Sequence, residues 1–253
     1  MTGTVYLVGA GPGAADLLTL RAARLLGQAD LILHDALVSD EVLALAPRAR
    51  KLNVGKRANR PSTDQSFINR LLVRAAHRGK VVVRLKGGDP MLFGRAQEEL
   101  DALNAACIPV EIVPGISAGF AAASEIAQSL TQRRLSRSVV FVTPAVARGD
   151  KSDDAWADAA AAADTAVVYM GKAEAARVRD AFVARGVPAN RPAVLVESAS
   201  QGGPVAGGTL GGLAEIAGRA GEGPALLLIG EAFAEAAARY ASNAGKGSAA
   251  RRA

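Results

Sequence analysis

Short apolar runs alternate with longer segments of helical periodicity along most of the chain. In the first half, the apolar runs predict strands at 4–8, 30–34, 51–54, 80–85 and 109–113. The periodic segments between them predict helices at 16–27, 40–46, 64–77 and 95–106. The run at 80–85 is rich in β-branched residues, which is typical of a strand that is buried on both faces of a parallel sheet.

The second half repeats the alternation. Apolar runs predict strands at 138–143, 165–170, 193–197 and 225–229, and an alanine-rich segment lies at 153–163. Helices are predicted at 173–185 and, after a glycine-rich turn, at 209–217. Strands that alternate with helices in this way predict an α/β protein with mainly parallel strands.

The pattern breaks near the middle of the chain, at Val113-Pro114-Gly115-Ile116. We therefore predict two α/β lobes, at 1–114 and 115–240, with a ligand-binding cleft between them. The tail at 241–253 contains alanine, glycine, serine and basic residues without periodicity, and we expect it to be disordered.

Composition narrows the class of protein. Half of the 253 residues are hydrophobic but only 4% are aromatic, so alanine, valine and leucine must fill the core. No apolar run approaches the roughly 18 residues of a membrane helix, and the strand predicted at 4–8 leaves no room for a signal peptide. The single cysteine, Cys107, excludes an internal disulfide, and two histidines leave little for a metal site. We expect a cytoplasmic protein that binds neither a metal nor a membrane.

The formal net charge of +6 is partly a property of the tail, which holds Lys246, Arg251 and Arg252 and no acidic residue. No basic stripe is interleaved with aromatic residues, so nucleic-acid binding is disfavoured. Arginines clustered around a small polyanionic substrate fit the charge better.

The segment Gly87-Gly88-Asp89-Pro90 begins two residues after the end of the strand predicted at 80–85. Adjacent glycines let the backbone bend sharply and let a ligand approach it closely, and the proline fixes the turn. The sequence therefore predicts a ligand-binding loop at the carboxyl edge of a sheet. An ordinary strand-to-helix turn is the alternative interpretation.

A second glycine-rich loop, Gly9-Ala10-Gly11-Pro12-Gly13, follows the first predicted strand. The dinucleotide fingerprint needs a glycine where Ala14 stands. Pro12 also lacks the backbone N–H that a phosphate site would use. A phosphate site is therefore disfavoured, and a loop that approaches some other ligand is favoured.

Several polar residues are candidates for chemistry at the same edge. Asp35 follows the strand predicted at 30–34 and is either a general base or the cap of the next helix. The pair Lys56-Arg57 follows another strand, and an exposed pair of this kind is ordinarily solvated surface. Five cations expected in loops at this edge are nevertheless candidates for anion recognition, namely Arg57, Arg60, Arg84, Lys86 and Arg95. Met170, beside Gly171 in the second half, is either a core residue or part of a pocket for an adenine or a thioether.

Taken together, these segments resemble the tetrapyrrole (cobalamin and sirohaem) methylases that use S-adenosylmethionine. The resemblance runs from Val5 to about Tyr240. The segments that carry it, in the order of the family, are Val5–Gly13, Asp16–Leu20, Asp35–Ser39, Val54–Arg57, Arg84–Arg95, Val113–Ala118 and Val168–Gly171. Within the family, the Gly55-Lys56-Arg57 step favours a member that acts on uroporphyrinogen III.

The resemblance implies a homodimer of two-lobed chains, with S-adenosylmethionine in the cleft, S-adenosylhomocysteine as product and no metal. It implies two methyl transfers, to C2 and C7 of uroporphyrinogen III, which give precorrin-2 for the sirohaem or cobalamin pathway. The N-terminal lobe would form the substrate side and the C-terminal lobe the cofactor side. By position, the cofactor would contact Pro12, Gly87, Gly88, Asp89, Leu92, Ser117, Ala118, Met170 and Ala199. Asp35 would be the proton acceptor and Lys56 the donor. The substrate's carboxylates would contact Arg57, Arg84, Lys86 and Arg95.

Four positions depart from the family's usual pattern: Ala14, His34, Ala96-Gln97 and Pro144-Ala145. The last two belong to segments expected near the substrate, so the position of the substrate or the turnover could differ. Alternative functions are methylation of a related precorrin and a catalytically silent, cofactor-binding paralogue. A nicotinamide dehydrogenase is disfavoured because the sixth-position glycine of its fingerprint is missing.

Overall fold

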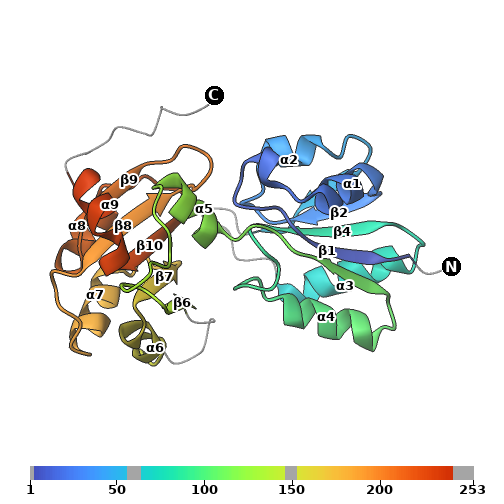
Figure 1. Cartoon of the computed structure of the whole chain (residues 1–253). Helices are drawn as coiled ribbons and strands as arrows, with labels where there is room; N and C mark the ends of the chain where they lie inside the picture. The colour runs from blue at the N-terminus through green and yellow to red at the C-terminus, as the bar shows by residue number, and fades with distance from the viewer. Residues whose placement is uncertain (1–2, 56–63, 146–152, 242–253) are drawn as a thin grey trace. The chain divides into compact units, whose positions relative to one another are not determined.

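The computed structural model describes residues 3–55, 64–145 and 153–241, which form two compact units (Figure 1). Unit 1 extends to Ala118 and unit 2 begins at Gly119. The Pro114-Gly115 step, where the sequence pattern breaks, therefore lies inside unit 1, a few residues before its end. The tail from residue 242 onward lies outside the described residues.

Unit 1 contains a five-stranded sheet in the order β3-β2-β4-β1-β5. Its strands are β1 (Val5–Gly9), β2 (Leu31–His34), β3 (Arg50–Asn53), β4 (Val82–Lys86) and β5 (Val110–Val113). Every pairing in this sheet is parallel. The central strand β4 is buried along its whole length, as its β-branched sequence predicts. Because all five strands run the same way, the loops that follow them emerge at one edge.

Helices cover both faces of this sheet (Figure 1). On one face, α1 (Leu20–Gln28) and α2 (Asp40–Ala44) pack against β-strand residues that include Ile32 and Val83. On the other, α3 (Gln65–Ala76) and α4 (Ala96–Ala105) pack against Leu7 and Leu33.

The first helix differs from its prediction. A short 3-10 turn covers Ala15–Leu17 and α1 begins only at Leu20, because the Thr19 hydroxyl accepts the Ala22 N–H at 3.1 Å and caps the helix there.

Unit 2 contains a second five-stranded sheet, in the order β6-β7-β10-β8-β9. Its strands are β6 (Val139–Val142), β7 (Thr165–Tyr169), β8 (Pro192–Glu197), β9 (Val205–Thr209) and β10 (Ala225–Gly230). Only β6 and β7 pair in parallel, so the prediction of mainly parallel strands is wrong for this unit. For β8 and β9 the cause is local, because they form a hairpin whose connection is too short for a parallel crossover.

The helices of unit 2 are α5 (Ala118–Glu125), α6 (Trp156–Ala162), α7 (Ala175–Val183), α8 (Leu213–Gly218) and α9 (Ala234–Arg239). Phe182, from α7, and Phe233 are the largest fully buried side chains among the described residues. Phe182 packs in a core of alanine, valine, leucine and isoleucine residues, as the composition requires. The residues at 205–209 form strand β9, and α8 begins only at Leu213, so the helix predicted at 209–217 begins too early.

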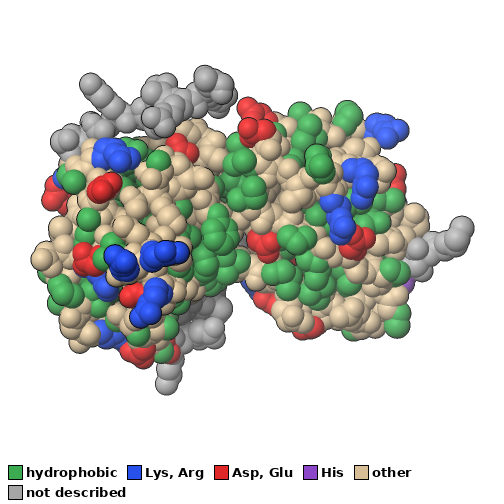
Figure 2. Space-filling model, viewed as in Figure 1, with side chains coloured by type: hydrophobic (Ala, Val, Ile, Leu, Met, Phe, Trp, Pro, Cys, Tyr) green, Lys and Arg blue, Asp and Glu red, His purple; other side chains and the backbone are tan. Residues whose placement is uncertain are grey.

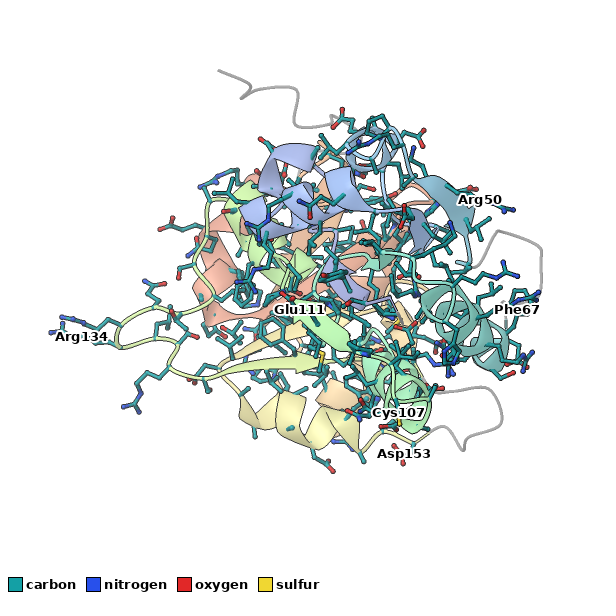
Figure 3. All side chains as sticks on the ribbon, turned by 90° about the vertical axis from the view of Figure 1, so that its right-hand side faces the viewer. Arg50, Phe67, Cys107, Glu111, Arg134 and Asp153 are labelled. Atoms are coloured by element: carbon teal, nitrogen blue, oxygen red, sulfur yellow. The ribbon has the colours of Figure 1, made fainter. Side chains whose placement is uncertain are left out.

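The surface seen in Figure 2 carries Lys and Arg side chains as well as Asp and Glu side chains on each unit. Figure 3 shows Arg134 at the tip of a loop that projects from unit 2. The backbones of Gln132 and Ser136 close this loop with hydrogen bonds of 2.9 and 2.8 Å. In the part of the chain that the structure describes, no helix is both long and apolar enough to cross a membrane.

Candidate functional site

Three loops at the carboxyl edge of the unit 1 sheet contact one another through the backbones of glycines, which have no side chain. Gly11, after β1, and Gly88, after β4, exchange hydrogen bonds of 3.2 and 2.7 Å between their backbones. Both glycines have left-handed φ angles, +70° and +67°, which residues with a side chain rarely adopt. Gly115, after β5, lies so close to Gly9 and Gly88 that a Cβ atom at position 115 would clash with their backbones.

Asp89 ties two of these loops together with one carboxylate. Its Oδ1 accepts the Met91 N–H at 2.8 Å, within its own loop. Its Oδ2 accepts the Gly115 N–H at 2.9 Å, from the loop after β5. Asp89 and its two preceding glycines are nevertheless half-exposed, so the loop combines a fixed shape with access for a ligand.

The structure brings most of the predicted cofactor residues of unit 1 to these loops. Gly88 presents its Cα toward Ser117 and Ala118, and a Cβ built there would lie 3.8 Å from each. Leu92 and Pro12 are half-buried residues of the loops after β4 and β1. Such distances are ordinary van der Waals contacts, so the left-handed φ of Gly88, and not a lack of space, is what favours a glycine here.

A cluster of four charged side chains lies beneath the same edge. The Arg84 guanidinium donates from Nη2 to Asp35 Oδ1 at 2.5 Å and from Nε to Glu99 Oε1 at 2.9 Å. Lys86 donates from Nζ to Glu99 Oε2 at 2.9 Å. Arg84, Lys86 and Glu99 are buried, whereas the Asp35 side chain is 30% exposed. Asp35 is therefore the member of the cluster that faces solvent.

The position predicted for Arg84 and Lys86 is wrong. Both were expected to act from loops, although the strand predicted at 80–85 already included Arg84. Both belong to strand β4, two residues apart, and point to the face covered by α3 and α4. Their cationic groups contact carboxylates inside unit 1. Arg84 also donates to the carbonyls of Leu33 and Leu85 at 3.3 and 3.2 Å.

Burial and charge act in opposite directions on the two cations. Burial lowers the pKa of Arg84, but the Asp35 and Glu99 carboxylates outweigh it and hold that pKa above its ordinary value. Burial, together with the nearby Arg84 charge, lowers the pKa of Lys86, and Glu99 only partly opposes them. Arg84 is thus the firmly charged partner of Asp35.

Arg95 differs from the two buried cations because it is exposed. It precedes α4 in a left-handed conformation, with φ at +54°, and bonds Glu98 twice at 2.7 Å. The hydrogen bond from Arg95 to Glu98 raises the pKa of Arg95. Its guanidinium is the cation of this group that a substrate could reach.

Unit 2 places its two predicted cofactor residues at one edge of its own sheet. Strands β7 and β8 both pair antiparallel with β10, so they run in the same direction and end at the same edge. Met170 follows β7 with φ at +54° and is 52% exposed. Ala199 follows β8 and lies between Ser198 and Ser200, which are also left-handed. Three unfavourable backbone conformations at one edge are typical of a functional site.

Glu99 is the member of the charge cluster that the sequence did not identify. It lies in the first turn of α4, where an acidic residue is ordinarily a solvated helix residue. Arg84 and Lys86 are the signal that could have led to Glu99. Two cations in a strand that is buried on both faces need a buried carboxylate as partner.

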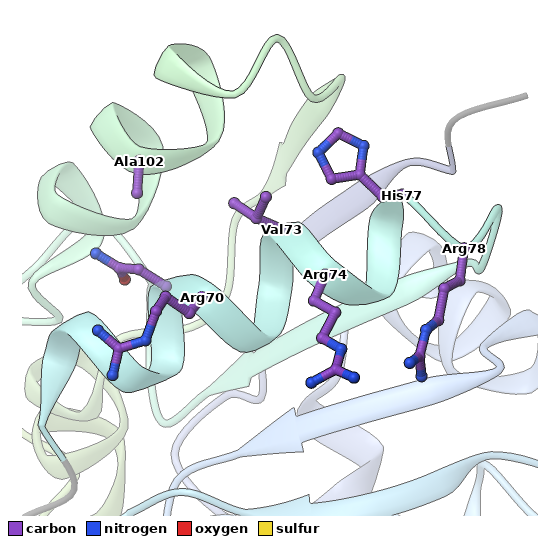
Figure 4. Close-up of a pocket in the computed structure, with 7 residues that line it drawn as sticks. Arg70, Val73, Arg74, His77, Arg78 and Ala102 are labelled. Carbon is purple, nitrogen blue, oxygen red and sulfur yellow. The ribbon is translucent and has the colours of Figure 1, made fainter.

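Two predicted residues, Lys56 and Arg57, lie outside the described residues, and so does Arg60. A groove elsewhere on unit 1 is lined by residues of α3, its C-terminal end and α4: Asn69, Arg70, Val73, Arg74, His77, Arg78 and Ala102 (Figure 4). Since α3 ends beside Gly3, at the start of β1, this groove extends toward the edge opposite the three loops. Among the described residues, no group of three or more His, Cys, Asp or Glu could hold a metal.

Residues 4–212 match the family model for Tetrapyrrole (Corrin/Porphyrin) Methylases. The chain belongs to this family. The resemblance inferred from the loop segments is thereby confirmed, and the α/β architecture with two five-stranded sheets is that of the tetrapyrrole methylase fold.

Two relatives within the family are similar to this tetrapyrrole methylase over most of its length. It is 46% identical over 233 residues to Uroporphyrinogen-III C-methyltransferase of Pseudomonas aeruginosa, covering 91% of this chain and 94% of that one. It is 45% identical over 231 residues to Siroheme synthase of Zymomonas mobilis, covering 90% of this chain but only 49% of that protein. The chain therefore spans about half the length of the siroheme synthase.

A solved structure of Uroporphyrin-III C-methyl transferase from Thermus thermophilus, complexed with S-adenyl homocysteine, is also similar. Its TM-score is 0.79 at 39% identity, covering 91% of this chain and 99% of that one.

Proposed function

We propose that this tetrapyrrole methylase transfers methyl groups from S-adenosylmethionine to C2 and C7 of uroporphyrinogen III, giving precorrin-2. The observation that carries the proposal is the 46% identity, over nearly the full length of both chains, to a relative named for this reaction. The Thermus relative complexed with S-adenyl homocysteine supports the choice of methyl donor. Methylation of a related precorrin and a silent paralogue are the alternatives that the assay must separate.

The loops of unit 1 fit such a donor. When bound, S-adenosylmethionine supplies a methyl group on a positively charged sulfonium that is already activated for transfer. We propose that Pro12, Gly87, Gly88, Asp89, Leu92, Ser117 and Ala118 contact it from unit 1, and Met170 and Ala199 from unit 2. The bare Gly88 backbone allows close approach, and the Asp89 carboxylate supplies negative charge for a cation.

Asp35 is the proposed proton acceptor. Transfer of a methyl cation equivalent to a pyrrole carbon forms a C–C bond, breaks the S–C bond and leaves a cationic ring, which is neutralised when a proton leaves. Asp35 is partly exposed and is held at the end of β2 by Arg84, so its carboxylate is oriented before the substrate arrives. Lys56 stays the predicted proton donor.

We propose that Arg95 contacts the substrate's carboxylates, and Arg57 stays a prediction for the same role. Arg95 is exposed, and its planar guanidinium suits carboxylates. Arg84 and Lys86, which were predicted for this role as well, are buried against Glu99 and are better assigned to the interior of unit 1.

The test of the function is anaerobic incubation with uroporphyrinogen III and methyl-labelled S-adenosylmethionine. Two labelled methyl groups per tetrapyrrole, on C2 and C7, are expected. Transfer only to a later precorrin would instead indicate the related methylase. Cofactor binding without transfer to any tetrapyrrole would indicate the silent paralogue.

Asp35→Asn tests the assigned base. We expect kcat to fall by about 10²–10⁴, the usual contribution of general acid–base catalysis, while affinity for S-adenosylhomocysteine stays within about threefold. The matched control is Asp101→Asn, the same acid-to-amide change at an exposed position of α4. Unchanged turnover in Asp35→Asn would exclude the base role.

We also propose that the chain is a homodimer. Phe120 and Leu135 are exposed apolar side chains of unit 2, and a second copy could cover them. Sedimentation velocity at micromolar concentration should show twice the mass of one chain.

The cytoplasmic location expected from the single cysteine also stays a prediction, for which cell fractionation is the test.

A further inference from the structure

The buried carboxylate Glu99 occupies the centre of the charge cluster in unit 1. It has no exposed side-chain surface, and its two oxygens contact different cations. We infer that Glu99 is a positioning residue, which orients the Arg84 guanidinium so that Arg84 in turn holds Asp35. This inference rests on the proposed function, in which Asp35 is the proton acceptor.

The contacts around Glu99 hold its carboxylate from two neighbouring elements, β4 and α3. Arg84 and Lys86 approach from β4, each at 2.9 Å and each on its own oxygen. Gln65, the first residue of α3, donates from Nε2 to Oε1 at 3.1 Å. Since three donors from two elements bond this one carboxylate, its position is fixed by its neighbours.

Arg84 transmits that position to Asp35. Its Nε is bonded to Glu99 and its Nη2 to Asp35, so the two carboxylates occupy two sides of one rigid, planar group. Displacement of Nε away from Glu99 must therefore move Nη2 relative to Asp35. The bonds from Nη1 to the carbonyls of Leu33 and Leu85, at 3.3 and 3.2 Å, are longer than either contact with a carboxylate.

The charges of the cluster balance only when Glu99 is present. Two cations, Arg84 and Lys86, face two carboxylates, Asp35 and Glu99. Other titratable groups nearby are His34, whose Nδ1 lies 3.0 Å from the Asp35 carbonyl, and the exposed pair of Arg95 and Glu98. Without the Glu99 charge, two buried cations would share Asp35, and burial already lowers the pKa of Lys86.

Glu99→Gln changes this arrangement with little change in shape. Arg84 and Lys86 each bond a different oxygen of Glu99. The amide keeps only one of these oxygens, so one of the two cations faces an N–H₂ group, which repels it. Adding Lys86→Met removes the competitor. In the double variant the amide oxygen is free for Arg84, and the cluster is again neutral.

The experiment compares kcat, KM and binding of S-adenosylhomocysteine in wild type, Glu99→Gln and Lys86→Met/Glu99→Gln. We expect Glu99→Gln to lose about tenfold to a hundredfold in kcat, the scale of a misplaced catalytic group. Its KM and its affinity for S-adenosylhomocysteine should stay within about threefold of wild type. The double variant should recover most of the lost kcat. Glu111→Gln, the same change at an exposed residue of β5, is the control and should match wild type.

A structural readout separates failure of this inference from failure of the proposed function. The Arg84 Nε–H should give a slowly exchanging ¹⁵N–¹H NMR signal, assigned with Arg84→Lys, that is displaced in Glu99→Gln and restored in the double variant. Glu99→Gln that keeps both this signal and its kcat would overturn the inference, as would a double variant no better than Glu99→Gln. A wild type that transfers no methyl group would overturn the proposed function, and the NMR signal would still decide whether Glu99 positions Arg84.

Discussion

The close contact of three loop backbones in unit 1 makes Gly115→Ala a sensitive probe of the site. An added Cβ at this position would lie 2.8 Å from Gly9 Cα and 3.1 Å from Gly9 C, and it would also collide with the Gly88 carbonyl oxygen. Real Cβ atoms essentially never lie under 3.0 Å from such neighbours. Neither neighbour is a flexible side chain, so the backbone itself must move.

The loss of stability depends on the hydrogen bonds that oppose this movement of the backbone. Gly88 is held to Gly11 by two backbone hydrogen bonds, and the Gly115 N–H donates a third hydrogen bond to the Asp89 carboxylate. Overpacking in a well-packed region costs about 1–3 kcal/mol. We expect Gly115→Ala to lie at the upper end of that range, because relief of the clash must break at least one of these bonds.

Gly27→Ala is the matched control, since it adds the same methyl group in the same unit. Gly27 lies in α1. Apart from its chain neighbours and the backbone of its own helix, no atom lies within 4 Å of its added Cβ. Alanine is a better helix former than glycine, so this variant should gain about 0.5–1 kcal/mol. The two variants should therefore shift the free energy of unfolding in opposite directions.

Urea unfolding followed by far-UV circular dichroism measures both variants, and calorimetric titration with S-adenosylhomocysteine measures the site. Gly115→Ala should also weaken binding of S-adenosylhomocysteine by more than about tenfold, equivalent to 1.4 kcal/mol, because the loop that carries Gly88 must shift. A Gly115→Ala protein as stable as wild type, with unchanged binding, would refute the reasoning that these backbones are in fixed contact.

Two further predictions concern carboxylates that accept backbone hydrogen bonds. Asp89→Asn leaves one acceptor oxygen for two N–H groups, so stability measured by urea unfolding should fall by about 1–3 kcal/mol; an unchanged value would contradict the roles of both oxygens. Hydrogen bonds from the Arg137 backbone and from Ser138 lower the pKa of Asp164 below 3.8. The stabilisation from Asp164 is therefore present above pH 3.8 and is lost as pH falls through the lowered pKa. The difference in melting temperature between wild type and Asp164→Asn should narrow below pH 3.8, and a constant difference would contradict this.

The sequence predicted unit 1 well because its local signals agree with its tertiary structure. Each apolar run became a parallel strand, and each periodic segment became a helix on one face or the other. Unit 2 was predicted less well, since alternation of strands and helices does not determine strand direction. The glycine-rich residues 205–209 have no strong strand propensity and form β9 only because β8 pairs with them.

The candidate site shows the same division between local and non-local information. The ligand-binding loop at Gly87-Gly88-Asp89 could be inferred from local chemistry, because bare glycines and a fixed turn act within a few residues. The partners of Arg84 could not be inferred from local chemistry. Asp35 and Glu99 are 49 and 15 residues away along the chain, and only the fold brings them to one guanidinium. Arg84 and Lys86 therefore looked like loop cations in sequence, although the fold buries them.

The structure also clarifies one departure from the family's usual pattern, Ala96-Gln97. Ala96 is buried in the first turn of α4 and belongs to the core between that helix and the sheet. Gln97 is exposed and donates to Asp101 Oδ1 at 2.7 Å, along the same helix. Both residues thus act within α4, where alanine and glutamine favour helix more than glycine does. The departure stabilises the start of the helix that holds Glu99, so it fits a positioning role for that carboxylate better than a change of substrate.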